Sequence, residues 1–555
     1  MKNLFCIHCN GFRKSFPDRQ ELRIEDAGEV FFVELLKKNI HMSRRKAYGE
    51  SRMTLSEDFN IPDKRPDAAG LIQKRGEVRL EETRTVEGQV QLSGTLEVHI
   101  LYVSEGEERR LCRIRAEFPF EEKLALPGAA AGDSVDVRPE LEDLKVRLIN
   151  SRKFSVQALV SFEAELEELY DVQAGVELHG EASVSTRSRK ITPLSLAVRK
   201  KDIVRVKEEL ALPSSKPNIG ELLWDSVELR GVDVRIQEES LDIRGELFLF
   251  VLYETEGEKK SREWMETSLP FQQSLECSGS GSGQIPDVEV TLSGVRLETV
   301  PDPDGEERMI QAEAVLNVNI RLYEEETVEI LSDVYTPEKE LIPVCREEGY
   351  ESLAGRNFSK CRASDRVRMN PEAPRMLQFC HSKGEVRIDE ARMTEQGIQV
   401  EGAVEVSILY VTSDDSMPFA VMEGDVPFSH LIEIEDPGEH CRFSLHAGLE
   451  QLSAAMVDSE EIEVKAGIDL NAFAAREQNG SFLTDIREKE LDLARIQEMP
   501  GIVGYLVQEG DTLWDIARDC LTTPEKIREW NQLGTEEALP GTRLLILKNI
   551  PSSRS

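Results

Sequence analysis

Segments in which apolar and polar residues alternate recur along most of the chain, and this period of two predicts β-strands with one buried face. The clearest segment occurs three times and each time ends on a tyrosine. Its apolar positions are Leu96, Val98, Ile100 and Tyr102; Leu247, Leu249, Val251 and Tyr253; and Val404, Val406, Ile408 and Tyr410. Further alternating segments cover residues 156–162, 312–320 and 462–470. The pattern predicts a mainly β fold.

These strands belong to three longer blocks that match without a gap over residues 66–120, 217–271 and 374–428. Each block has a proline, a Glu-apolar-Arg triplet, a glycine, the tyrosine and a Pro-Phe pair at the same spacings. The glycines are Gly94, Gly245 and Gly402, and the pairs end on Phe120, Phe271 and Phe428. Pro217 stands 151 residues after Pro66, and Pro374 stands 157 after Pro217. A period of this length is typical of duplicated whole domains rather than of a solenoid.

The second copy differs on the opposite face of the repeated strand. That face carries Thr95, Glu97 and His99 in the first copy and Ala403, Glu405 and Ser407 in the third, but Phe248 and Phe250 in the second. Two apolar faces predict a sheet that is covered on both sides. We expect a larger core or a hairpin folded over the sheet, and the alternative is a contact with another domain or a partner.

Small and turn-forming residues predict mobile loops at residues 127–133, 278–283 and 436–438. The run at 278–283 reads SGSGSG and lacks the Gly-Lys-Ser/Thr ending of a phosphate-binding loop. Accumulated Pro, Ser and charge place domain joints near residues 200–212 and 340–370.

The sequence pattern changes after residue 501. A short strand at 504–507 and a turn precede a helix start signal made by Thr512 and Asp515. A second helix has Thr523 as N-cap and Pro524 at its first position. Residues 543–547 form a closing strand, so the order is strand, helix, helix, strand.

The composition excludes some function classes. The chain has 555 residues with 105 acidic and 68 basic side chains, a net charge of −37. Such a balance disfavours sequence-independent binding of nucleic acid or anionic lipid, which both need clustered Lys and Arg. No window has the roughly 18 to 20 apolar residues of a membrane-spanning helix, and the first residues lack the apolar stretch of a signal peptide. We therefore expect a cytoplasmic protein.

Candidate chemistry is sparse. Nine scattered cysteines do not form a disulfide framework, and the single CxxC, Cys6 to Cys9 around His8, has no second ligand pair, so no metal is expected. No catalytic motif occurs, and we expect no catalytic residue and no cofactor. The one alternative is a Cys-His nucleophile among Cys380, His381, His440, Cys441 and His446, which have no counterparts in the other copies. The acidic run Glu163–Glu168 is interpreted as a solvated face.

Two resemblances follow from these motifs. The Pro-rich lead-ins and the GEVR and ILYV segments of copies one and three resemble the SPOCS domain of bacterial spore-coat proteins, although copy two has Val227 where the others have Gly76 and Gly384. The segments YLVQEGDTLWDIA, IREWNQL and PGTRLLIL resemble the LysM module.

The LysM resemblance implies a shallow groove of the kind that binds N-acetylglucosamine-containing glycans. Carried over by position, the groove residues are Gly510, Asp511, Thr512 and Leu513 on one side and Asn531, Gln532 and Leu533 on the other. Trp514 and Trp530 stand among apolar helical positions, so we expect them in the core or half-buried rather than as ligand platforms. A single LysM copy is a weak glycan anchor.

Three SPOCS-like repeats and a LysM module together resemble the SipL-type spore morphogenetic proteins. The expected domains are an N-terminal segment (1–58), three SPOCS-like domains (59–205, 212–340 and 369–490) and the LysM domain (503–548). Residues 1–32 are expected to be a mis-assigned start or disordered, with Val33 as the first translated residue.

The SipL-type resemblance implies a non-enzymatic adaptor in the mother-cell cytoplasm at the forespore surface. Its partner would be the ATPase that builds the basement layer of the spore coat, bound with help from the LysM module. The alternative is a peptidoglycan-binding or N-acetylglucosamine-binding protein at the spore cortex or cell wall. An exported structural protein of the cell surface is a third class.

Overall fold

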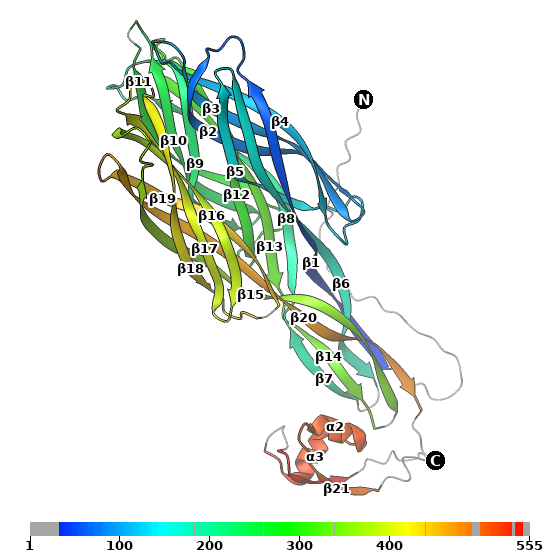
Figure 1. Ribbon diagram of the computed structural model, residues 1–555. Helices are drawn as coiled ribbons and strands as arrows, with labels where there is room; N and C mark the ends of the chain where they lie inside the picture. Colours follow the sequence, from blue (N-terminus) through cyan, green and yellow to red (C-terminus); the bar gives the residue numbers. More distant parts are fainter. Residues whose placement is uncertain are drawn as a thin grey trace, which may run out of the picture.

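The computed structural model describes residues 33–180, 184–258, 260–337, 339–438, 440–490, 500–534 and 539–547. Residues 1–32 lie outside this part of the chain, and with them Cys6, His8 and Cys9. The described chain is mostly strand, and it is arranged as a broad body, a narrower stalk and a small α+β module (Figure 1). The predicted mainly β fold class is confirmed.

The first repeat forms a sandwich of two three-stranded antiparallel sheets. Its strands are β1 (Val33–Asn60), β2 (Ala68–Val86), β3 (Gln89–Ser104), β4 (Leu111–Ala125), β5 (Asp136–Asn150) and β6 (Lys153–Gly180). One sheet has the order β2-β3-β4 and the other β1-β6-β5. The predicted apolar face of β3 is buried between them, where Tyr102 packs edge-on to Phe154 with ring centroids 6.0 Å apart.

The other two repeats have the same topology. The second contains β8 (Leu194–Ala211), β9 (Ile219–Gln237), β10 (Ser240–Thr255), β11 (Arg262–Glu276), β12 (Ile285–Val300) and β13 (Met309–Glu325). The third contains β15 (Glu340–Arg368), β16 (Met376–Thr394), β17 (Gly397–Thr412), β18 (Phe419–Glu433), β19 (Cys441–Met456) and β20 (Glu461–Lys489). In each domain the first strand pairs with the last, so the two ends of the repeat lie side by side in one sheet.

The repeated motif residues are structural. A Cβ on Gly94 would stand 2.3 Å from the carbonyl oxygen of Arg79 and 2.7 Å from the ring of Phe120, so only glycine lets the phenylalanine lie across the sheet. The tyrosine hydroxyls donate to the carbonyl oxygens of the motif prolines over 2.9 to 3.1 Å, in the pairs Tyr102 with Pro66, Tyr253 with Pro217 and Tyr410 with Pro374. The motif residues therefore stabilise the packing within each sandwich.

Strand pairing shifts the domain limits from those expected. β1 pairs with β6 from Val33 to Asn60, so residues 33–58 belong to the first sandwich rather than to a separate segment. Residues 200–211 and 340–368, expected as joints, lie in β8 and β15. The expected mobile loop at 278–283 contains the buried Ser280, whose hydroxyl donates to the carbonyl oxygen of Gln237 over 2.8 Å.

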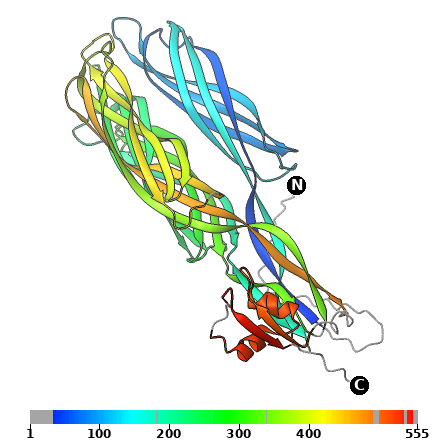
Figure 2. The ribbon, with the colours of Figure 1, turned by 60° about the horizontal axis from the view of Figure 1, so that its bottom comes forward.

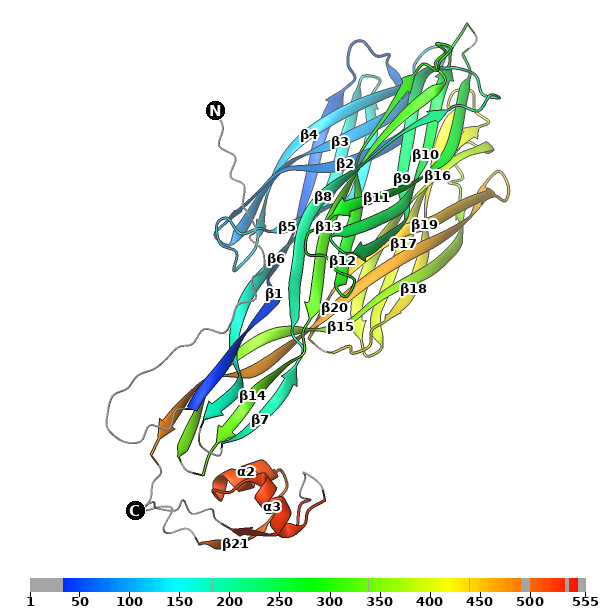
Figure 3. The same cartoon turned by 180° about the vertical axis from the view of Figure 1, so that it is seen from behind.

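The stalk consists of three antiparallel ribbons, one from each repeat. β1 and β6 continue below the first sandwich, β15 and β20 continue below the third, and β7 (Ser185–Ile191) pairs with β14 (Val328–Tyr335) (Figure 3). The ribbons share a core made of Ile40, Met42, Val172, Ala174, Ile191, Val328, Ile330, Tyr350 and Phe482. Because this core draws on all three repeats, the stalk ties the domains together.

The three sandwiches lie side by side above the stalk (Figure 2). An apolar cluster between the sandwiches contains Leu101, Leu252 and Leu409 from equivalent positions of the three repeats. Phe250 belongs to this cluster and stacks on His381 of the third repeat at 4.1 Å. The second face of copy two is therefore covered by neighbouring domains, which corrects the expectation of a larger core or covering hairpin.

Candidate functional site

The C-terminal module has the predicted order, with β21 (Ile502–Leu506), α2 (Leu513–Asp519), α3 (Pro524–Asn531) and β22 (Arg543–Leu547). Thr512 and Thr523 cap the two helices, and each side chain accepts from the backbone N–H three residues on. Its core contains Val507, Leu513, Ile516, Ala517, Ile527, Leu544 and Ile546. The cap residues and the spacing of the apolar positions therefore predicted the helices of this module correctly.

The first side of the predicted groove is a tight turn. Gly510 has φ +94°, which favours glycine, and no atom lies within 4 Å of the Cβ position. The carboxylate of Asp511 accepts from the backbone N–H of Gln508 at 2.7 Å and from the hydroxyl of Tyr505 at 2.8 Å. Leu513 is buried in the module core. Asp511 and Leu513 therefore hold the shape of the turn, and the Thr512 hydroxyl is engaged by Asp515 at the start of α2.

The second side follows α3. Asn531 donates to the carbonyl oxygens of Ile527 and Leu545, both at 2.8 Å, so its amide joins α3 to β22. Gln532 ends the helix in the left-handed conformation, with φ 52°. A shallow surface pocket beside it is lined by Glu525, Arg528, Glu529, Gln532 and Leu533. Leu533 packs against the same core as Leu513. Both predicted sides therefore belong to one compact module, and ligand binding by these residues stays a prediction.

The two tryptophans are half-buried. Trp514 points to the stalk, where its indole N–H donates to Asp333 at 2.8 Å. It is thus committed to a contact between domains, which no local sequence signal could reveal because Asp333 is 181 residues away.

The candidate Cys-His nucleophile is not assembled. Cys441 packs against the core of the third sandwich, whereas His446 on the same strand points to the second repeat and bonds Asp287 at 2.8 Å. Cys380 is buried, and burial raises the pKa of its thiol to about 12. His381 bonds Glu266 at 2.6 Å. Cys380, His381 and His446 therefore serve contacts between domains, whereas Cys441 serves the core of its own sandwich.

A central ion cluster lies where the three sandwiches meet, and the sequence did not predict it. Arg321 of β13 approaches Glu165 of β6 at 3.2 Å, and Arg442 of β19 bonds Glu351 through two 2.7 Å contacts. The hydroxyl of Tyr323 donates to Glu167 at 2.9 Å. The solvated face expected for Glu163–Glu168 is wrong for Glu167, whose side chain is 5% exposed, because alternate residues of β6 point to the cluster.

Burial in this cluster disfavours the charged forms of Glu167 and His446. Burial raises the pKa of Glu167, with partial compensation by Arg442 and Arg321. Burial alone would lower the pKa of His446, but hydrogen bonds and charges from Asp287 and Glu289 outweigh it and raise the pKa to about 9. The paired charges of the cluster therefore link the domains. The shifted pKa values of Glu167 and His446 follow from burial and from these pairings.

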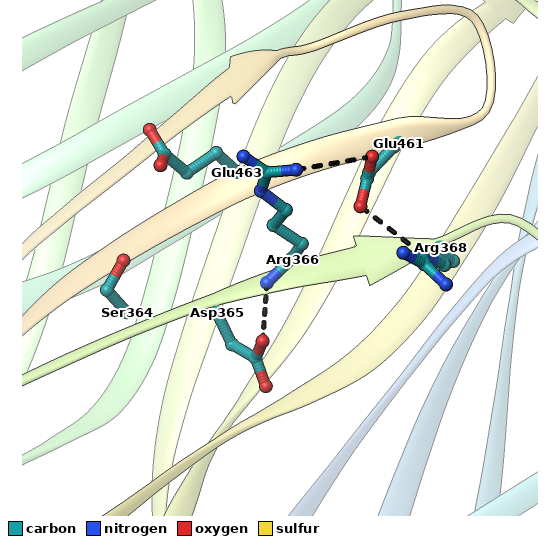
Figure 4. A pocket seen from close by; sticks show the side chains of 6 residues that line it. All are labelled: Ser364, Asp365, Arg366, Arg368, Glu461 and Glu463. Atoms are coloured by element: carbon teal, nitrogen blue, oxygen red, sulfur yellow. Dashed lines mark hydrogen bonds and ion pairs between the residues drawn. The ribbon is translucent and has the colours of Figure 1, made fainter.

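A second surface pocket lies on β15 and β20 (Figure 4). Glu461 stands between Arg368, at 3.3 Å, and Arg366, at 3.8 Å. These side chains form ion pairs with one another at the protein surface. The residues that line this pocket do not pair a nucleophile with a base. Among the described residues no group of three His, Cys, Asp or Glu side chains is placed to hold a metal ion. The described helices include none that is both long and apolar enough to cross a membrane.

Comparison with protein families matches the three repeats and the terminal module separately. The model described as SipL, SPOCS domain, matches residues 67–149, 218–300 and 375–457. The model described as LysM domain matches residues 505–546. The chain is a SipL-type protein. No curated protein and no solved structure matches it.

The SipL-type assignment makes this a sporulation-related protein with a module of the peptidoglycan-binding kind. Both SPOCS and LysM are non-catalytic domain families. The resemblances that the sequence motifs indicated are thereby confirmed.

Proposed function

We propose that this SipL-type protein is a non-enzymatic adaptor that helps anchor the basement layer of the spore coat on the forespore surface. Its LysM module would bind a protein partner, the ATPase that builds this layer, in the mother-cell cytoplasm. The observation that carries the proposal is the combination of three SPOCS domains with one LysM module in a single chain.

The geometry supports an adaptor in two ways. The stalk separates the LysM module from the broad body, so that the two lie at opposite ends of the molecule (Figure 1). The polar clusters described above include ion pairs that cross domain boundaries, which suits a rigid scaffold.

A pull-down with the purified basement-layer ATPase tests the proposal. The full chain should retain the ATPase, and a chain ending before residue 500 should lose most of it. Chitin oligomers should not compete with the ATPase. Retention that is equal with and without the LysM module would refute the proposed role of the module.

The LysM match also favours a second function, glycan binding at the cortex or cell wall. In that case chitin oligomers would bind the full chain tightly through the groove residues, and the ATPase would not be retained. A fluorescent fusion separates the two functions in the cell, because encirclement of the forespore favours the adaptor and an exported signal favours the glycan-binding protein.

A further inference from the structure

The end of the stalk contacts the LysM module through the ribbon of β7 and β14. Asp333, near the end of β14, accepts hydrogen bonds at 2.8 Å from the indole N–H of Trp514 and from the guanidinium of Arg518. The side chain of Asp333 is 18% exposed, so both bonds lie in a partly desolvated setting where charge-assisted bonds are stronger than in water.

Tyr335 adds an apolar part to this contact. It is 4% exposed and belongs to the same hydrophobic cluster as Leu513 and Ile516 of α2. Its ring meets the Trp514 ring edge-on, with centroids 4.8 Å apart. Its hydroxyl donates to the carbonyl oxygen of Thr522 at 3.0 Å, and burial raises its pKa to about 12.

We propose that Asp333 and Tyr335 form a docking site on the stalk that fixes the orientation of the LysM module. The module is then part of the scaffold and not a tethered ligand-binding unit, whichever partner it recognises. Since Trp514 and Arg518 are used by the stalk, an outside partner must approach the remaining surface, which includes the predicted groove.

The docking site also connects to the groove through side chains. Arg518 bonds Asp515 at 3.2 Å as well as Asp333, and Asp515 accepts from the Thr512 hydroxyl at 2.6 Å. Thr512 is a predicted groove residue and the N-cap of α2. Asp333 is therefore a positioning residue, because it holds the helix whose start forms one side of the groove.

A charge exchange tests the docking site in the full chain. Asp333→Arg removes the acceptor and places two cations together, and Arg518→Asp places two anions together. Hydrogen exchange should become about tenfold faster in peptides covering residues 513–522 in either variant, because loss of docking lowers local protection. The double variant D333R/R518D should recover at least half of that change on a logarithmic scale, although the Trp514 bond stays lost.

The matched control is Glu329→Arg, which makes the same charge change at an exposed position of β14. It should leave exchange in 513–522 unchanged. Unchanged exchange in both single variants, or a double variant that shows the sum of the two effects, would overturn the docking site. If Asp333→Arg does not fold, Arg518→Asp alone decides, since that side chain is 44% exposed and lies outside the module core. No partner enters this experiment, so its outcome is independent of the proposed function.

Discussion

At the scale of single residues, equivalent positions of the three repeats make similar contacts, and the second copy differs at one of them. Arg79 and Arg387 pair with Glu97 and Glu405, which stand at equivalent positions. In the second copy this glutamate is replaced by Phe248, and Arg230 stacks on its ring at 3.8 Å. Arg230 also bonds Glu228, which accepts from the backbone N–H of Gly384 in the third repeat at 2.7 Å. Copy two therefore has a cation–ring contact where copies one and three have an ion pair, and Arg230 and Glu228 take part in the interface with the third repeat.

The motif glycines should differ in their tolerance of alanine. Gly94→Ala should lower the free energy of opening of β3 by about 2 kcal/mol, because the new Cβ would meet the Arg79 carbonyl at 2.3 Å. Gly245→Ala should cost less, since its nearest atoms belong to the Phe271 ring at 2.9 Å and the Arg230 oxygen is 3.4 Å away. Native-state hydrogen exchange in β3 and β10 measures both, and equal costs would contradict the argument.

The motif tyrosines offer a second residue-scale prediction. Tyr410→Phe removes the hydroxyl that donates to Pro374 at 3.1 Å, and it should destabilise β17 by about 1 kcal/mol because the carbonyl oxygen loses its partner. Hydrogen exchange of β17 amides gives the value. Tyr48→Phe, at a side chain 44% exposed, is the control and should change little.

At the scale of elements, the stalk ribbons hold the domains together through a small core. Phe482 is fully buried and packs edge-on to Tyr350 at 6.1 Å. Phe482→Ala should therefore cost about 3 to 5 kcal/mol and expose all three ribbons to exchange together. Leu169→Ala, at a side chain 63% exposed on β6, should cost less than about 0.5 kcal/mol. If exchange rises only in β15 and β20, the ribbons do not share one core.

Elements that rest on local signals were predictable, and those that rest on distant partners were not. The alternating strands, Thr512 and Thr523 as caps, and the half-buried state of Trp514 all follow from nearby residues. β1 has little alternation, and it is a strand because Val33 pairs with Gly180 and Asn60 with Lys153. The partner of Trp514, Asp333, and the burial of Glu167 likewise depend on how domains meet. The groove residues came from resemblance, and their role stays a prediction.

At the scale of the whole molecule, the paired charges between domains make stability depend on pH. His446 bonds Asp287 of the second repeat at 2.8 Å, and its pKa is raised to about 9 from an ordinary value of 6.5. Its stabilising contribution is fully present below pH 6.5 and is lost as the pH rises through 9. The full contribution is on the order of 3 kcal/mol.

Thermal unfolding of the wild-type chain between pH 6 and pH 10 should therefore show a falling midpoint. His446→Gln should be less stable than wild type at pH 6 and should flatten this part of the profile, because glutamine does not titrate. His430→Gln is the control, because it makes the same side-chain change at a half-buried position of β18. Parallel profiles for wild type and His446→Gln would contradict the assignment.

The joining of three equivalent sandwiches in one chain has a consequence for stoichiometry. Three separate subunits around a common axis would place identical residues there and would carry either three terminal modules or none. Here the equivalent strands β6, β13 and β20 bring Glu165, Arg321 and Phe473 to the centre, and β14 contacts the LysM module through Asp333. Because the three sandwiches are covalently linked, different residues can occupy equivalent positions at the centre. The linkage also fixes the ratio at one LysM module for three SPOCS domains, whatever the protein concentration.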